Sequence, residues 1–120
     1  MSFDLVVWAM QDGASGSDVR TAQELCRQGH RAPGSPEPRI VSFYRAVTAA
    51  YPDRVAAPGS PSPWEVSPLH VRADHIEMNL TETCPDEVLL TIERLAGEHG
   101  LQLLDLQDGS VYPPPARIVR

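Results

Sequence analysis

Lysine is missing from this sequence. All ten basic residues are arginine, and they stand against 16 acidic residues, so the 120-residue chain has a formal net charge of -6. Proteins that bind nucleic acid normally present a basic stripe that displaces counterions from the phosphates. The acidic balance therefore argues against nucleic-acid binding. The bias toward arginine, alanine and proline is typical of GC-rich codons and indicates nothing about mechanism.

Long apolar runs and paired cysteines are also scarce. The apolar run 5–10 is far shorter than the roughly 18 residues that a membrane-spanning helix needs, and no basic segment precedes it as in a signal peptide. The only cysteines, Cys26 and Cys84, are expected to be free thiols in a reducing compartment. We expect a cytoplasmic protein without membrane association.

What the chain does contain is typical of a folded domain. With 42% hydrophobic and 22% charged residues, the composition is that of a globular protein, and the length predicts one domain. Twelve prolines interrupt the chain, five of them between residues 52 and 68, which predicts a long surface loop. We expect a single domain over residues 1–112 and an extended Pro-rich tail over 113–120.

Hydrophobic periodicity predicts a mixed order of elements. The expected strands cover 3–10, 69–80 (a hairpin turning near Ala73-Asp74), 101–106 and 111–112, and the expected helices cover 15–29, 38–51 and a segment from 83–87 to Gly100. This order predicts an α+β fold of the ferredoxin-like split βαβ type, with its first helix broken in two. A single antiparallel sheet would carry all helices on one face, leaving the other open to solvent or to a second copy in a homodimer.

The predicted hairpin supplies the first candidate site. Alternation over residues 69–80 places His70, His75 and Glu77 on one face, with His70 opposite Glu77. Two imidazoles and a carboxylate are ligands for zinc or iron, and the alternative is an ordinary solvated face. Arg72 lies among them and would repel a cation.

Two further segments are candidates for reactive sites. The loop Gln11–Ser17 precedes a helix N-terminus, where backbone amides bind phosphate, but no lysine follows it and Asp12 would repel an anion. Cys84 also lies near a helix start, where a thiolate is favoured, although acidic neighbours oppose this. We interpret the loop as a capped turn, Cys84 as a packing residue, and Cys26, on an apolar helical face, as core.

Trp64 differs from the other candidates because it lies in a Pro-rich loop. An aromatic residue there either anchors the loop to the core or is presented as a binding hot spot. Both interpretations stay open, and Tyr51 and Tyr112 are candidates for an aromatic cluster with it.

Five segments form a recognisable set: 3–8, 43–52, Ser62-Pro63-Trp64, 95–101 and Asp105-Leu106-Gln107. In these segments the sequence resembles a family of small, mostly uncharacterised bacterial proteins, some of them immunity or toxin-associated. The segments consist of core and turn residues, so the resemblance implies a shared fold and no catalytic residues. After the Gly-Leu strand the family usually has Asp-Pro-Gln, whereas this chain has Asp105-Leu106-Gln107, with Leu106 in place of the proline.

Two hypotheses for function follow. The first is a non-enzymatic binding module, immunity-like as the resemblance implies, with no cofactor. Its acidic surface would attract a basic protein partner, with contacts at Asp12, Tyr51, Trp64 and Glu65. The alternative is a small dimeric ferredoxin-like enzyme or ligand-binding protein that uses His70, His75 and Glu77.

Overall fold

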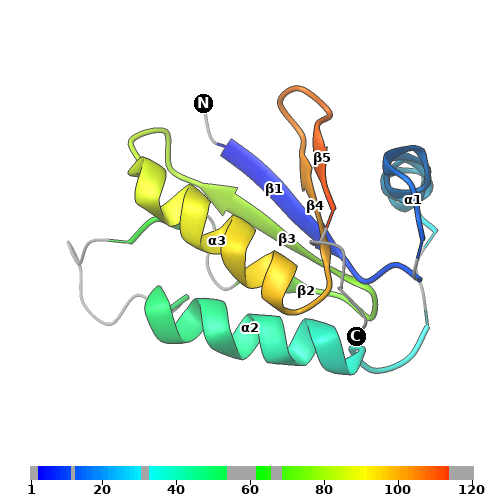
Figure 1. Ribbon diagram of the computed structural model, residues 1–120, viewed down its shortest axis with the longest axis horizontal. Coiled ribbons are helices and arrows are strands. Elements are labelled where there is room, and N and C mark those ends of the chain that lie inside the picture. The colour runs from blue at the N-terminus through cyan, green and yellow to red at the C-terminus, as the bar shows by residue number, and fades with distance from the viewer. Residues whose placement is uncertain (1–2, 12, 31–32, 54–61, 66–68, 114–120) are drawn as a thin grey trace, which may run out of the picture.

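Three helices and five strands form within the residues that the computed structural model describes, which are 3–11, 13–30, 33–53, 62–65 and 69–113 (Figure 1). In chain order they are β1 (Phe3–Trp8), α1 (Gly16–Arg27), α2 (Pro38–Ala50), β2 (His70–Val71), β3 (His75–Leu80), α3 (Asp86–Glu98), β4 (Gln102–Asp105) and β5 (Val111–Tyr112). Each predicted helix and strand is present, most with slightly shorter bounds.

The strands make one sheet in the order β2-β3-β1-β4-β5, and every neighbouring pair is antiparallel. The predicted α+β class and the single antiparallel sheet are confirmed. The order of the first four strands is consistent with the ferredoxin-like class. The short strand β5 extends the sheet beyond β4 as a hairpin.

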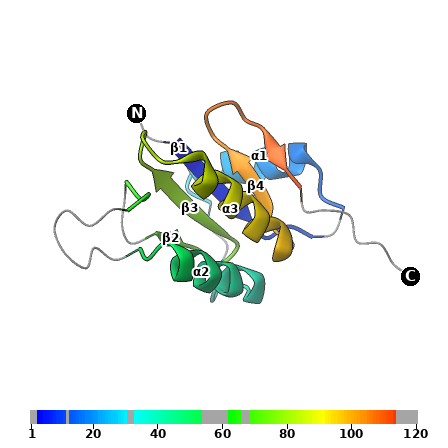
Figure 2. The same cartoon turned by 60° about the vertical axis from the view of Figure 1, so that its left-hand side comes forward.

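The helices do not all cover the same face of the sheet. Helices α2 and α3 lie side by side on one face, whereas α1 lies on the other (Figures 1 and 2). Alternation along β1 explains this arrangement, because Leu5 and Val7 join the core under α2 and α3, while Val6 and Trp8 pack against α1. The expectation of helices on one face is therefore wrong, and α1 and α2 are not halves of one broken helix.

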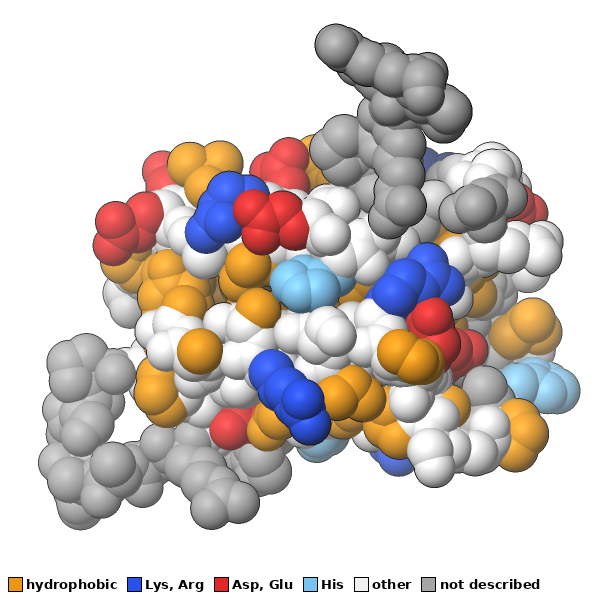
Figure 3. Space-filling model, turned by 60° about the horizontal axis from the view of Figure 1, so that its bottom comes forward, with side chains coloured by type: hydrophobic (Ala, Val, Ile, Leu, Met, Phe, Trp, Pro, Cys, Tyr) orange, Lys and Arg blue, Asp and Glu red, His pale blue; other side chains and the backbone are white. Residues whose placement is uncertain are grey.

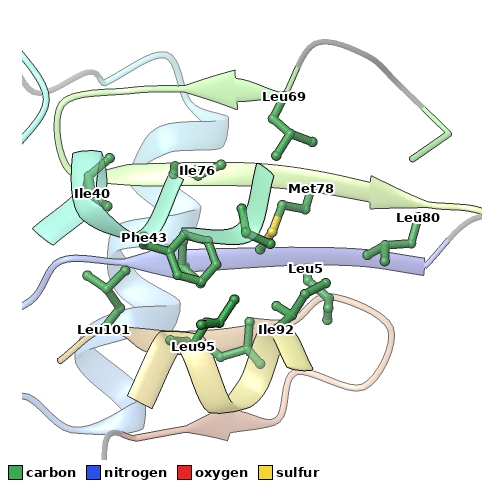
Figure 4. Close-up of a cluster of buried hydrophobic side chains, with 14 of the residues drawn as sticks. Leu5, Ile40, Phe43, Leu69, Ile76, Met78, Leu80, Ile92, Leu95 and Leu101 are labelled. Atoms are coloured by element: carbon green, nitrogen blue, oxygen red, sulfur yellow. The ribbon is translucent and has the colours of Figure 1, made fainter. Parts of the chain in front are cut away.

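The larger core lies between the sheet and the pair α2 and α3. Buried side chains of the helices and of the sheet pack against one another there. Figure 4 shows Phe43 of α2 and Ile92 and Leu95 of α3 packed over the strands. Helix α2 buries Ile40, Phe43 and Val47 completely, at the spacing of one helical face. Pro38 at its start fits a position whose N–H has no helical partner.

Helix α1 begins at a capping box. The Ser15 hydroxyl accepts a hydrogen bond from the Asp18 N–H, and the Asp18 carboxylate accepts one from the Ser15 N–H. The predicted glycine stop is also present, since Gly29 follows the helix with φ of +95°. Val19 and Cys26 face the sheet and are buried, so α1 is fixed on this face by two residues near its opposite ends.

The described part of the Pro-rich loop is tied to the sheet by Trp64. This side chain is buried, donates a hydrogen bond from Nε1 to the Tyr51 carbonyl at 2.8 Å, and lies edge-on to the Tyr51 ring. Backbone hydrogen bonds from Glu65 to Asn79 and from Thr81 to Pro63 join the loop to the end of β3. Of the two interpretations, the anchor is the one observed.

Some expectations fall outside the described residues. Asp12 is one, and so are residues 114–120 of the predicted tail and most of the loop 52–68. No helix in the described part of the chain is long and apolar enough to span a membrane.

Candidate metal centre

The polar side chains of β2 and β3 share the face of the sheet that α1 partly covers. His70 lies opposite Glu77, as the hairpin register predicted, and Val6 and Trp8 of β1 lie beside Glu77 and His75 in the next strand. Directly paired residues of antiparallel strands point to the same side. The pattern of β3 therefore directs His75 and Glu77 toward the face that carries α1.

Helix α1 converts part of this face into a buried site. It covers His75, whose side chain is 2% exposed, while Glu77 is 32% exposed and His70 51% exposed. Cys26, in the last turn of α1, is 5% exposed. Of the three residues expected on an open face, His75 is buried, Glu77 is partly exposed and His70 is exposed. The thiol of Cys26 contacts the buried one, His75.

Three potential ligand atoms converge beneath the end of α1. Cys26 Sγ lies 3.5 Å from His75 Nε2, and Glu77 Oε1 lies 3.9 Å from the same nitrogen. All three atoms lie within 4.8 Å of one another. The three residues come from two segments about fifty positions apart, brought together only by the packing of α1 on the sheet.

A neighbouring carboxylate orients the imidazole of His75. Asp74 Oδ1 lies 2.7 Å from His75 Nδ1, and because a carboxylate only accepts hydrogen bonds, the proton of a neutral imidazole resides on Nδ1. The lone pair of Nε2 then points toward Cys26 and Glu77. Metal-ligating histidines characteristically donate their second ring N–H in this way.

Trp8 stacks on the imidazole of His75. The indole and imidazole stack with centroids 4.1 Å apart and planes 20° from parallel. The indole Nε1 in turn donates to Gln23 Oε1 of α1 at 3.3 Å. His75 is therefore positioned by a stack and a hydrogen bond, independently of any bound ion.

The separation of sulfur and nitrogen suits tetrahedral coordination. Zinc bonds of about 2.3 Å to sulfur and about 2.0 Å to nitrogen place these ligand atoms about 3.6 Å apart at a tetrahedral angle. The observed 3.5 Å matches that value, and without a metal the same two atoms form a hydrogen bond. The nitrogen–oxygen separation of 3.9 Å is longer than the tetrahedral value by about half an ångström, and the partly exposed Glu77 side chain has room to move.

Cys26, His75 and Asp74 also resemble a catalytic triad of cysteine, histidine and aspartate. The surroundings of the thiol disfavour that use. Cys26 lies at the C-terminal end of α1, where the helix dipole is negative, and the Glu77 carboxylate lies nearby. Both the dipole and the carboxylate attract a cation, which favours a metal ligand over a nucleophile.

His70 does not belong to the converging group. Its Nδ1 lies 3.4 Å from Glu77 Oε2, on the solvent side of the carboxylate, while Oε1 faces His75. Of the predicted set, the structure brings His75 and Glu77 together with Cys26 and leaves His70 as an outer partner of Glu77. Arg72 is exposed beyond the β2 strand.

The other predicted reactive positions take structural roles. Burial, followed by the charge of Asp86, raises the pKa of the Cys84 thiol above its usual value of 9.0, which favours the unreactive thiol. The described residues of the loop before α1 cap the helix through Ser15 and Asp18. The position of Asp12 itself is outside the described residues.

The predicted partner-binding residues around the Pro-rich loop lie together at the end of α2. Tyr51 is half-buried against Trp64, and Glu65 is exposed. Contact of these residues with a partner stays a prediction.

Comparison with family models, with curated proteins and with solved structures gives no match for this chain. The resemblance to the bacterial family with the Asp-Pro-Gln motif stays a prediction. The site must therefore be interpreted from its own geometry and chemistry.

Cys26 is the candidate ligand that sequence reasoning missed. A cysteine on an apolar helical face is typical of a core residue, and Cys26 does pack against Val6, Trp8 and Val19. The sequence carries one signal for such a contact: if a helix covers the face of His75, the buried imidazole needs a hydrogen-bond partner. The sequence alone did not indicate that α1 would cover it.

Proposed function

We propose that the protein binds a zinc-class divalent cation through Cys26 Sγ, His75 Nε2 and Glu77 Oε1. The observation that carries the proposal is the convergence of these three atoms within 4.8 Å, at the end of a helix and beside an oriented imidazole. A thiolate, an imidazole and a carboxylate together favour Zn²⁺ over the harder Mg²⁺ and Ca²⁺.

The charges of the site support a dication. A thiolate and a carboxylate neutralise two positive charges, and Asp74 stabilises the imidazole from outside the ligand set. This is the ligand-binding alternative drawn from the sequence, with Cys26 in place of His70.

Metal binding requires a reduced thiol, and neither Cys26 nor Cys84 forms a disulfide. A reducing compartment satisfies this condition. The proposal accordingly includes a cytoplasmic location.

Cobalt(II) is the sharpest probe of this centre, because thiolate ligation produces a charge-transfer band and tetrahedral geometry produces intense visible bands. We expect one equivalent of Co²⁺ to give both, and Zn²⁺ to displace it. Cys26→Ser should abolish the charge-transfer band, and Glu77→Gln should lower the affinity at least about tenfold.

Two matched variants serve as controls. Cys84→Ser removes the other thiol, and His99→Gln removes a histidine whose Nδ1 lies 2.8 Å from the Leu95 carbonyl. Both should bind Co²⁺ as the unaltered chain does. Absence of the band in the reduced, folded protein, or its loss in Cys84→Ser, contradicts the proposal.

A second candidate function, binding of a basic protein partner, is favoured by the outer surface of α3. This helix exposes four carboxylates, Asp86, Glu87, Glu93 and Glu98, with one arginine among them. Toward the upper left of Figure 3, acidic side chains lie beside an arginine and close to apolar side chains. Leu90 is 64% exposed at the centre of the helix. Such a surface steers a basic partner toward a small apolar contact.

Ionic strength tests this second candidate. A basic protein captured from a lysate should associate more slowly as salt rises, and more slowly with Glu93→Gln than with Glu24→Gln, an exposed glutamate on α1. Equal rates for the two variants, or rates independent of salt, contradict it.

A further inference from the structure

A hollow of about 270 Å³ lies directly against the proposed metal centre. Its walls include the ligands Cys26 and His75, the carboxylate Asp74 and the apolar side chains of Trp8, Ala22 and Leu25, with His30 also lining it. Leu25 and His30 are exposed, so the hollow opens to solvent between the end of α1 and the turn before β3.

The proposed centre uses three protein ligands, and tetrahedral zinc has four. Structural zinc sites fill all four positions with side chains, whereas open sites leave one for water or another molecule. In the described residues, Cys26, His75 and Glu77 are the only such cluster. No fourth side chain, His30 of the same hollow included, joins this cluster among the described residues, so the fourth position is open to water or to a small molecule. The adjoining hollow provides the space for it.

The charge of the metal centre favours a neutral molecule as the fourth ligand. Cys26 thiolate and Glu77 carboxylate cancel the two charges of the metal, so an anion would leave the centre negative. It would also lie beside Asp74 on the same wall, in a chain of net charge -6. A neutral donor avoids both penalties.

Size and wall chemistry narrow the choice further. The hollow is smaller than the roughly 300–1,000 Å³ of sites that enclose drug-sized ligands. Trp8 and Leu25 provide apolar surface for a flat or short aliphatic body. We propose, on the basis of the proposed metal centre, that this hollow binds a small neutral nitrogen donor of the imidazole class as the fourth ligand of the metal.

The test titrates the Co²⁺-loaded protein with imidazole and, in parallel, with azide and acetate. The visible bands of Co²⁺ should shift to a saturating end point with imidazole, and the anions should bind at least about tenfold more weakly. Ala22→Phe, which places a ring in the hollow, should weaken imidazole binding about tenfold and leave the thiolate band intact. Leu90→Phe on α3 is the matched control and should change neither.

The outcomes separate the two proposals. A thiolate band that is insensitive to imidazole overturns the ligand proposal and leaves the metal centre standing. Stronger binding of azide or acetate than of imidazole overturns the assigned ligand class. Unchanged imidazole binding in Ala22→Phe shows that the hollow is not the site. No thiolate band at all overturns both proposals.

Discussion

The imidazole of His75 stacks on the indole of Trp8 with ring centroids 4.1 Å apart, while its Nδ1 lies 2.7 Å from the Asp74 carboxylate. The two contacts hold a buried ring in one orientation, and its remaining nitrogen faces a thiol from another element. A polar group buried in this way needs hydrogen-bond partners. Asp74, next to His75 in sequence, supplies one of them, and the packing of α1 on the sheet supplies the other, Cys26.

Removing the indole should loosen both the fold and the site. Trp8→Leu eliminates the stack and the hydrogen bond to Gln23, and we expect the free energy of unfolding to fall by about 3 kcal/mol. Trp8→Phe keeps a ring against His75 and should cost about 1 kcal/mol for the lost hydrogen bond. Urea unfolding measures both. If Co²⁺ affinity is the same in Trp8→Leu and Trp8→Phe, the stack does not position the ligand.

Zinc should stabilise the folded chain by mass action. At a free Zn²⁺ concentration 100 times the dissociation constant, we expect the free energy of unfolding to rise by about 2.7 kcal/mol. Cys26→Ser should lose most of this gain, whereas Cys84→Ser should retain it. Denaturant unfolding with Zn²⁺ and with a chelator provides the measurement. Equal stabilisation of the two serine variants would place the metal elsewhere.

Trp64, which anchors the Pro-rich loop, should contribute several kilocalories per mole to the free energy of unfolding. Trp64 is 6% exposed and bonds to the Tyr51 carbonyl, so Trp64→Ala should lower the free energy of unfolding by about 3–5 kcal/mol. Trp64→Phe, which keeps an aromatic ring but lacks the N–H, should cost less, about 1–2 kcal/mol. Urea denaturation of the two variants decides the point. A negligible loss in Trp64→Ala shows that Trp64 is not an anchor.

Cys84 should be a slow nucleophile at neutral pH. Burial, and then Asp86, raises the pKa of this thiol above 9.0, so the thiolate fraction stays small until the pH passes that value. In a Cys26→Ser background, alkylation by iodoacetamide should accelerate with rising pH up to above pH 9. Asp86→Asn should shift the profile only partly toward lower pH, because desolvation is the larger cause. A plateau reached below pH 8 contradicts this picture.

The capping box should control the stability of the helix that carries Cys26. Ser15→Ala removes the acceptor for the Asp18 N–H, and we expect a loss of about 1 kcal/mol. Thr21→Ala, an exposed substitution in the middle of α1, is the matched control and should have little effect. Thermal unfolding followed by circular dichroism measures the difference, and an equal loss in both variants rules out a role for the cap.

The local features of the fold were readable because they depend on neighbours in sequence. Serine and aspartate three positions apart predict the start of α1, Pro38 predicts the start of α2, and alternation predicts that His70 faces Glu77. Short connections favour antiparallel neighbours, which explains the pairs β2–β3 and β4–β5. Strand β1 pairs with β3 and β4 across long stretches of chain. These features determined the α+β class.

The face of the sheet that α1 covers could not be predicted from the sequence. Its apolar stripe predicts that one side is buried, but β1 is apolar on both faces, through Val7 on one side and Val6 on the other. Either face of the sheet would accept the stripe. The choice depends on contacts between segments far apart in the sequence, such as Val19 and Cys26 against Val6 and Leu104.

By itself, the sequence determined the elements, the antiparallel sheet and the face on which His75 and Glu77 lie. The tertiary structure alone decided that α1 covers this face, that His75 is buried there and that Cys26 meets it. Backbone propensities and side-chain alternation are local, so they appear in the sequence as patterns. The meeting of a thiol with an imidazole 49 positions away depends on how two layers pack, and no local pattern encodes that.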